Sequence, residues 1–168
     1  MGVMSRTKSS AEESASLARV IGVGDAKVFN SVTEMVSDPN INALWICAPN
    51  FTRIEIMEEI VNAIESGKGE LIGVTCEKPL GRNVKEAKKV LELTQKVGLL
   101  DGYLENQVFA PSVTRGKEII WSRGAKATGR PYLARAAEEH SGPHMPWFWE
   151  GELQLSLIHI SEPTRPRE

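Results

Sequence analysis

The amino-acid sequence predicts an α/β fold in which helices cover a parallel β-sheet. Two apolar runs, residues 43–48 and 71–76, are nearly continuous and are bounded by turn-forming residues. Such runs are typical of strands that are buried on both faces of a parallel sheet. Strand and helix patterns alternate at intervals of roughly 25–30 residues, which indicates βαβ crossovers.

Each element is predicted from a local apolar pattern and the turn residues that bound it. Residues 52–65 carry apolar side chains at helical spacing, and Gly67 follows their last turn. Residues 9–20 form a helix that Ser9 or Ser10 is expected to cap. The full set comprises helices at 9–20, 32–36, 52–65, 83–97 and 111–123 and strands at 2–4, 27–29, 43–48, 71–76, 99–104 and, opening a different sheet, 132–138.

Composition and charge exclude several classes of protein. The 168 residues are 41% hydrophobic and 25% charged, with a formal net charge of -2, which excludes a disordered tail. No run of about 18 apolar residues is present, so no membrane span is predicted. The near-neutral charge argues against nucleic acid as the main partner. Cys47 and Cys76 lack Cys-x-x-Cys spacing, which predicts neither a disulfide framework nor a zinc site and favours a reduced, cytoplasmic setting.

Polar residues follow the predicted strands at the points where ligands bind to open parallel sheets, beyond the carboxyl ends of the strands. Because these ends meet at one edge of a sheet, we expect the residues to converge on one site. The four segments are Ser5-Arg6-Thr7-Lys8, Ala48-Pro49-Asn50-Phe51-Thr52, Glu77-Lys78-Pro79 and Glu105-Asn106-Gln107.

Three of these segments also carry a family resemblance. In their order and spacing they resemble the Gfo/Idh/MocA oxidoreductases, and the resemblance runs from about residue 2 to about residue 154; the segments are Ala48-Pro49-Asn50, Cys76-Glu77-Lys78-Pro79-Leu80 and Glu105-Asn106-Gln107-Val108-Phe109. The resemblance implies a Rossmann domain for NAD(P) followed by an α+β domain for a sugar, polyol or related substrate. It divides the chain into an incomplete Rossmann domain (1–123), the start of the α+β domain (124–154) and a tail (155–168).

The Glu77-Lys78-Pro79 step is the sharpest functional candidate. The resemblance implies that the Lys78 ammonium contacts the substrate hydroxyl that is oxidised and helps to position the nicotinamide, which makes Lys78 the predicted catalytic residue. It also implies that Glu77 contacts the cofactor side and that Pro79 follows a cis peptide bond. The alternative interpretation is a solvated Glu-Lys pair at the start of a loop, which is the commoner fate of such pairs.

Residues at the other strand ends are predicted to bind the cofactor, which is NADP or NAD. Ser5, Arg6 and Lys8 offer donors and positive charge where a Rossmann fold meets the adenosine ribose, and this favours the 2′-phosphate of NADP. Alternatively they are ordinary basic residues before a helix.

The remaining cofactor contacts are implied by the resemblance. Ala48, Pro49, Asn50 and Thr52 are expected along the path of the nicotinamide ribose and phosphates. The family commonly has His where this chain has Arg53, so position 53 departs from its pattern. The last set of predicted contacts, which could instead cap the end of a strand, is Glu105, Asn106 and Gln107.

Two further motifs are rejected as sites. Gly22-Val23-Gly24 follows a predicted helix rather than a strand and lacks the third glycine of a dinucleotide fingerprint, so it is interpreted as a helix stop. His140 and His144 bracket a Gly-Pro pair without a third ligand at useful spacing, so we expect a loop of the substrate domain and no metal.

Both ends of the sequence depart from a complete member of this family. No Gly-x-Gly-x-x-Gly precedes Ser5, so the chain is expected to begin inside the second Rossmann strand, with two half-sheets and unpaired inner edges as the consequence. Residues 155–165 resemble a translated sequencing-library adaptor, which predicts that the tail is not native. The family's later Asp and His acid/base motif is absent, so the chain alone is expected to be inactive.

The function predicted for the full-length parent is that of an NAD(P)-dependent dehydrogenase. It would transfer a hydride between nicotinamide and a sugar, polyol or related hydroxyl substrate, and a homo-oligomer is plausible for it. The main alternative is a non-catalytic nucleotide-binding or assembly protein on the same scaffold, which the presence of Lys78 disfavours. A flavodoxin-like or receiver fold would need an acidic cluster or phosphate loop after the first strand, and neither is seen.

Overall fold

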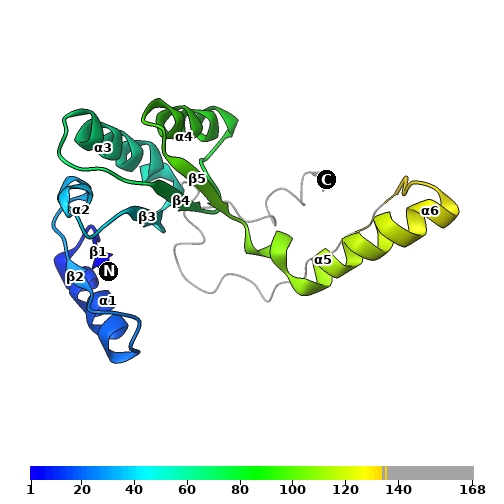
Figure 1. Cartoon of the computed structure of the whole chain (residues 1–168), viewed down its shortest axis with the longest axis horizontal. Helices are drawn as coiled ribbons and strands as arrows, with labels where there is room; N and C mark the ends of the chain where they lie inside the picture. Colours follow the sequence, from blue (N-terminus) through cyan, green and yellow to red (C-terminus); the bar gives the residue numbers. More distant parts are fainter. Residues whose placement is uncertain (134, 136–168) are drawn as a thin grey trace, which may run out of the picture. The chain divides into compact units, whose positions relative to one another are not determined.

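The computed structural model describes residues 1–133 and 135 (Figure 1). These residues belong to two compact units, the first comprising Met1–Tyr103 and the second beginning at Leu104. The proposed domain boundaries at residues 123 and 154 stay predictions.

The first unit has the predicted α/β architecture, with its described strands in two parallel sheets. One sheet pairs β1 (Gly2–Val3) with β2 (Lys27–Val28). The other has the order β3-β4-β5, formed by β3 (Ala43–Ile46), β4 (Gly73–Glu77) and β5 (Leu100–Leu104). The separation of the strands into two sheets agrees with the expectation of two half-sheets.

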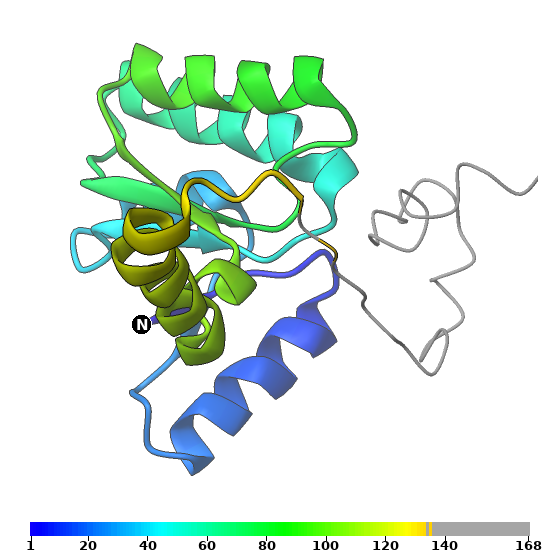
Figure 2. The same cartoon turned by 90° about the vertical axis from the view of Figure 1, so that its right-hand side faces the viewer.

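Two long helices cover one face of the three-stranded sheet. They are α3 (Arg53–Glu65) and α4 (Val84–Lys96), which pack against each other and lie on the same side of the sheet (Figure 2). The short helix α2 (Val32–Ser37) packs beside α3. Large apolar side chains from these elements interlock with those of the strands, and the buried set includes Met57, Ile60, Val61, Val90, Leu93, Leu44, Ile46, Val74 and Cys76.

The two-stranded sheet packs against α1 (Lys8–Val20) through much smaller side chains. Its buried cluster consists of Ala15, Ala18 and Ala26, with Val3 and Val28 partly buried against them. Arg19 adds a polar link, since its guanidinium donates a hydrogen bond of 2.6 Å to the Ala26 carbonyl oxygen.

The helix ends confirm some predicted caps and correct one. Gly67 and Gly98 have positive φ values of 68° and 69°, the left-handed conformation that ends helices and favours glycine. The expected cap of α1 at Ser9 or Ser10 is wrong, because the helix begins at Lys8 and its N-cap residue is Thr7. The Thr7 and Ser10 hydroxyls instead form a hydrogen bond of 2.7 Å. The Ser10 hydroxyl therefore has a partner although Ser10 lies inside the first turn and does not cap the helix.

The prediction that residues 43–48 are buried on both faces of the sheet is also wrong. Burial alternates along β3, with Leu44 and Ile46 inside and Trp45 66% exposed, and Leu100 of β5 is 71% exposed. The physical reason is that both α3 and α4 cross on the face that carries Leu44, Ile46 and Val74. Within the described part of the first unit, the opposite face of this sheet carries no covering helix (Figure 1).

The second unit is largely helical in its described part. After η2 (Asn106–Phe109), the chain runs through α5 (Pro111–Glu118), the π-helical stretch η3 (Ile119–Gly124) and α6 (Ala125–Thr128). The predicted helix at 111–123 is therefore found and extends to Thr128. Tyr132, Leu133 and Arg135 have no regular structure. The rest of the predicted strand at 132–138, as well as His140, His144 and the tail from 155, lies outside the described residues.

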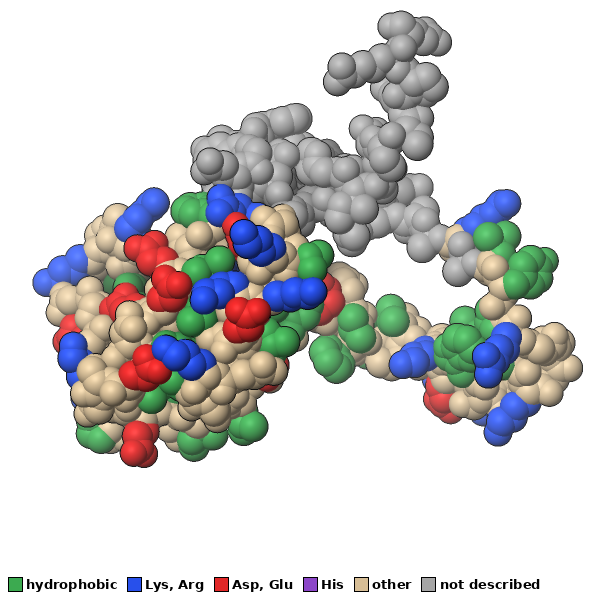
Figure 3. Space-filling view, turned by 90° about the horizontal axis from the view of Figure 1, so that it is seen from above, with side chains coloured by type: hydrophobic (Ala, Val, Ile, Leu, Met, Phe, Trp, Pro, Cys, Tyr) green, Lys and Arg blue, Asp and Glu red, His purple; other side chains and the backbone are tan. Residues whose placement is uncertain are grey.

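The surface of the first unit carries charges of both signs. Seen from above Figure 1, basic and acidic side chains are mixed on this face of the molecule (Figure 3). An ion pair joins the ends of α3 and α4, where Lys96 Nζ lies 2.8 Å from Glu65 Oε1. None of the helices in the described ranges is both long enough and apolar enough to cross a membrane.

Candidate functional site

The carboxyl end of β4 carries the Glu77-Lys78-Pro79 segment. Lys78 follows the last residue of the strand and is exposed, whereas Glu77 is half-buried. The Lys78 backbone N–H donates a hydrogen bond of 3.1 Å to Glu77 Oε2. The peptide bond between Lys78 and Pro79 is cis, as the resemblance implies.

The end of β3 lies beside it, because Ile46 of β3 pairs with Cys76 of β4. There the chain turns through Ala48 and Pro49 into η1 (Asn50–Thr52), which leads directly into α3. Thr52 closes this turn, its hydroxyl donating a hydrogen bond of 2.8 Å to the Pro49 carbonyl oxygen. The sheet therefore brings two of the four predicted segments together at one edge.

Asn50 is the unusual residue in this turn. It is 5% exposed, and neither its Nδ2 nor its Oδ1 has a hydrogen-bond partner among the described residues. A buried amide without partners is destabilising by about 1–3 kcal/mol. Asn50 therefore presents an unfilled donor and an unfilled acceptor, a combination that a ribose hydroxyl or a carboxamide complements.

Arg53 links the ends of the two strands. This first residue of α3 is 2% exposed, and its guanidinium donates hydrogen bonds to the carbonyl oxygens of Glu77 and Ala48, the latter at 3.2 Å. Arg53 is not among the site residues predicted from the sequence. Its position in the helix indicates burial, because Arg53, Met57, Ile60 and Val61 follow the helical repeat of the buried face of α3.

Neither Cys76 of β4 nor Cys47, which directly follows β3, is an activated thiol. Burial raises the pKa of the Cys76 thiol, and the neighbouring Arg53 guanidinium opposes this shift. Burial also raises the pKa of the Cys47 thiol, with a further contribution from the negative charge of Glu77. Both groups therefore stay protonated at neutral pH, so neither has the thiolate character that nucleophilic catalysis requires.

The predicted adenosine-ribose segment follows β1. Ser5 is half-buried, while Arg6 and Lys8 are exposed. Lys8 lies in the first turn of α1 and forms an exposed ion pair with Glu12, with 3.8 Å between Lys8 Nζ and Glu12 Oε1. The segment thus has cationic groups at the carboxyl end of a parallel strand, and their role at the adenosine ribose stays a prediction.

The fourth predicted segment belongs to the second unit. Glu105 is half-buried at the start of η2, and Asn106 and Gln107 are exposed within it. Its backbone is held locally, since the Val108 N–H donates a hydrogen bond of 3.3 Å to the Glu105 carbonyl oxygen. This segment follows the carboxyl end of β5 and belongs to the second unit, whereas Lys78 belongs to the first. Across the described ranges, no group of three or more His, Cys, Asp and Glu residues is arranged to hold a metal ion.

A parallel α/β sheet with polar and charged side chains beyond the carboxyl ends of its strands has the architecture of the Rossmann-like nucleotide-binding folds. Comparison with known proteins identifies the family within this fold class. The model of the Gfo/Idh/MocA oxidoreductase family, described as having an NAD-binding Rossmann fold, matches residues 1–102, and the chain belongs to this family.

Two relatives match a similar part of the chain. The chain is 32% identical over 100 residues to a 1,5-anhydro-D-fructose reductase of Ensifer adhaerens, which is 60% of this chain and 27% of the relative. It is 28% identical over 123 residues to a myo-inositol 2-dehydrogenase of Thermotoga maritima, which is 72% of this chain and 33% of the relative. The chain therefore spans about a third or less of the length of these relatives.

Solved structures show the same fold. An oxidoreductase from Thermotoga maritima superimposes with a TM-score of 0.57 and 31% identity, covering 71% of this chain and 33% of that one. GenD2 of gentamicin A biosynthesis, solved in complex with NAD, is similar with a TM-score of 0.58 and 23% identity, covering 74% of this chain and 32% of that one. The family description agrees with the cofactor predicted from the sequence, NADP or NAD.

Proposed function

We propose that this chain is the cofactor-binding part of an NAD(P)-dependent dehydrogenase whose substrate is a sugar, a polyol or a related hydroxyl compound. The observation that carries the proposal is the exposed Lys78 directly after β4, together with the unfilled amide of Asn50 in the turn that follows the paired strand β3. The names of the relatives, an anhydrofructose reductase and an inositol dehydrogenase, support the substrate class.

The residues at the strand ends fit such a cofactor. Asn50 offers a donor and an acceptor to a ribose hydroxyl or a carboxamide, and Arg6 and Lys8 offer positive charge to a ribose 2′-phosphate. When bound, the nicotinamide ring accepts or supplies the hydride. The chain itself has no Gly-x-Gly-x-x-Gly sequence to cradle the pyrophosphate, so we expect weak cofactor affinity and no turnover from this chain alone.

Lys78 is proposed to act on the substrate oxygen. Oxidation of an alcohol removes a proton from its hydroxyl and a hydride from its carbon, and negative charge builds on the oxygen as the proton leaves. A neutral amine at Lys78 Nζ accepts this proton, and the ammonium so formed stabilises the charge on the oxygen through a hydrogen bond; in the reductive direction the same ammonium returns the proton to the oxygen.

The proposal is tested in two stages. First, binding of NADP and NAD to this chain is measured by titration calorimetry, with Arg6→Asp as the variant. We expect Arg6→Asp to lower the ratio of NADP to NAD affinity, and an unchanged ratio would contradict a 2′-phosphate contact at Arg6. A chain that binds neither nucleotide at millimolar concentration would contradict the assignment of the cofactor residues.

Second, turnover is measured with a panel of sugars and polyols in the complete dehydrogenase that contains this segment. Lys78→Gln is expected to lower kcat about 100-fold or more, because it removes the group that accepts the proton from the reacting oxygen. Lys68→Gln is the matched control, since Lys68 is an exposed lysine that follows α3 away from the carboxyl ends of the strands. Full activity of Lys78→Gln would favour the non-catalytic nucleotide-binding alternative.

A further inference from the structure

Arg53 occupies a position that is electrostatically unfavourable for a cation. It is a permanently charged side chain, 2% exposed, at the N-terminus of α3, where the helix dipole is positive. Among the described residues no carboxylate lies within ion-pair distance of its guanidinium. A buried charge without a carboxylate partner is destabilising unless hydrogen bonds compensate it.

Backbone carbonyl groups at the two strand ends compensate the two terminal nitrogens of the guanidinium, whereas its Nε has no hydrogen-bond partner among the described residues. The guanidinium donates to the Ala48 carbonyl oxygen after β3 and to the Glu77 carbonyl oxygen at the end of β4. A planar guanidinium, with several N–H groups in fixed directions, reaches two such acceptors at once. Arg53 thereby fixes the distance between the turn that holds Asn50 and the peptide that precedes Lys78.

The bond to Glu77 acts on the peptide unit of Lys78 itself. The Glu77 carbonyl and the Lys78 N–H belong to one planar peptide group. The carbonyl accepts from Arg53, and the N–H donates to Glu77 Oε2 at 3.1 Å. Because both polar groups of this unit have partners, its plane is held, and the Lys78 side chain starts from a fixed backbone.

We propose that Arg53 is a positioning residue, whose buried guanidinium bridges the ends of β3 and β4 and so orients the Lys78 ammonium toward the substrate. This inference rests on the proposed function, in which Lys78 acts on the substrate oxygen. A small apolar residue at position 53 would give α3 an adequate buried face, but it would leave the Glu77–Lys78 peptide without its carbonyl partner.

The first test uses this chain and does not depend on activity. Amide hydrogen exchange is measured by NMR in the wild type, Arg53→Met, Arg53→Lys and Met57→Ala. Met57, fully buried on α3, supplies the matched control, because its truncation weakens the same helix without touching the strand ends. We expect Arg53→Met to speed exchange at the Lys78 amide about tenfold relative to the Val74 amide in the middle of β4.

The controls separate positioning from general destabilisation. Met57→Ala is expected to speed exchange at both amides to a similar degree, and Arg53→Lys, which keeps the charge and one donor group, to restore part of the protection at Lys78. Equal acceleration at Lys78 and Val74 in Arg53→Met would overturn the proposal, because Arg53 would then stabilise the fold without a local effect on Lys78.

The second test asks whether Arg53 acts through Lys78 in the complete dehydrogenase. Arg53→Met is expected to lower kcat about 100-fold with a much smaller change in KM for the nucleotide, since displacement of a reacting group by about 1 Å has this order of effect. The double variant with Lys78→Gln is expected to be no slower than Lys78→Gln alone. Multiplied effects in the double variant would overturn the proposal, whereas full activity of Lys78→Gln would overturn the proposed function itself.

Discussion

The two sheets of the first unit are built from the same type of parallel pairing but from side chains of different size. The three-stranded sheet is held by Met, Ile, Val and Leu residues of α3 and α4, whereas the two-stranded sheet rests on the three alanines Ala15, Ala18 and Ala26. Because hydrophobic stabilisation scales with the apolar area that is buried, the first region gains far more per residue. The Lys78 site therefore lies on the well-packed region and the Arg6 segment on the weakly packed one.

Truncation of a core side chain should show this difference most clearly. Ile60→Ala removes a fully buried side chain of α3 and is expected to lower the free energy of unfolding by about 2–5 kcal/mol. Ala15→Gly in α1 has only one methyl group to lose and is expected to lower it by about 1 kcal/mol, mostly through helix propensity. Urea unfolding followed by circular dichroism measures both, and equal losses would refute the comparison.

A smaller difference is expected when a methyl group is added to a strand glycine. A Cβ at Gly73 of β4 would lie 2.7 Å from the Leu100 carbonyl oxygen, which is fixed by its place in the sheet. A Cβ at Gly2 of β1 would lie 2.5 Å from Phe29 Cε2, at the end of a side chain that rotates. We therefore expect Gly73→Ala to be destabilising by about 1–3 kcal/mol and Gly2→Ala by less.

The same unfolding measurement serves as the check for the two glycine variants. Gly67→Ala offers a reference for backbone strain alone, since Gly67 has a φ of 68° and no atom within 4 Å of an added Cβ. A Gly2→Ala variant less stable than Gly73→Ala would show that Phe29 is held as firmly as the backbone of β5.

Local opening should also differ between the sheets. The pairing of β1 with β2 ends in two backbone hydrogen bonds, from Lys27 N–H to the Met1 carbonyl oxygen at 3.0 Å and from Phe29 N–H to the Val3 carbonyl oxygen at 2.9 Å. We expect these two amides to exchange with solvent about tenfold or more faster than the Val74 amide, because little apolar surface must be exposed to release them. Equal protection would indicate that both sheets open as one cooperative unit.

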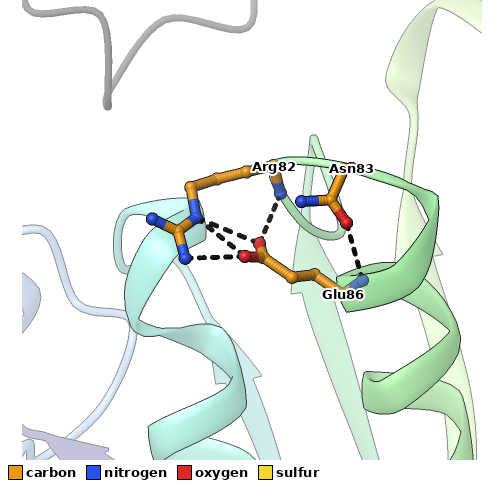
Figure 4. A network of polar contacts seen from close by, with 3 residues as sticks. All are labelled: Arg82, Asn83 and Glu86. Carbon is orange, nitrogen blue, oxygen red and sulfur yellow. Dashed lines mark hydrogen bonds and ion pairs between the residues drawn. The ribbon is translucent and has the colours of Figure 1, made fainter.

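The smallest expected effect is a pH dependence of stability that comes from two surface carboxyl groups, Glu86 and Asp38. Side-chain hydrogen bonds from Arg82 hold the pKa of Glu86 below its usual value (Figure 4). Backbone and side-chain hydrogen bonds from Asn40 do the same for Asp38, which also pairs with Lys27 of β2 at 3.7 Å. Because both folded-state pKa values are lowered, their contributions to stability are present above the unfolded-state pKa values and are lost as pH falls through the folded-state values.

NMR titration of the two carboxyl groups checks this prediction. Both midpoints are expected below the ordinary values of 4.5 for Glu86 and 3.8 for Asp38. Arg82→Ala should move only the Glu86 midpoint upward. A Glu86 midpoint that stays in place would contradict the role of Arg82, whereas Asp38 serves as the internal reference.

The sequence predicts those parts of the fold that depend on local patterns. The helix at 83–97 is found as α4 within one residue at each end, because Asn83 caps it through a hydrogen bond of 3.0 Å from the Glu86 N–H (Figure 4) and Gly98 ends it. The end of β4 at Glu77 is likewise close to its prediction, which ends at residue 76. These features depend on residues that are close in the sequence, so they can be predicted without knowledge of tertiary packing.

The features that sequence reasoning missed depend on contacts between distant segments. Trp45 belongs to an apolar run, but whether a helix covers it is decided by how α3 and α4 cross the sheet. Arg53 looks like a solvated residue at a helix start until the ends of β3 and β4 are brought to its guanidinium. Charge is a poor guide to burial when backbone carbonyl groups provide the partners.

The exposed indole on the uncovered sheet face provides an optical reporter. Trp45 is the only tryptophan of the sequence between residues 1 and 103. After Trp121, Trp147 and Trp149 are replaced by phenylalanine, the fluorescence of the chain comes from Trp45 alone. Its emission should then lie near that of a water-exposed indole. Any molecule or segment that covers this face would move the emission to shorter wavelength. Fluorescence therefore measures in real time whether this face of the sheet is covered.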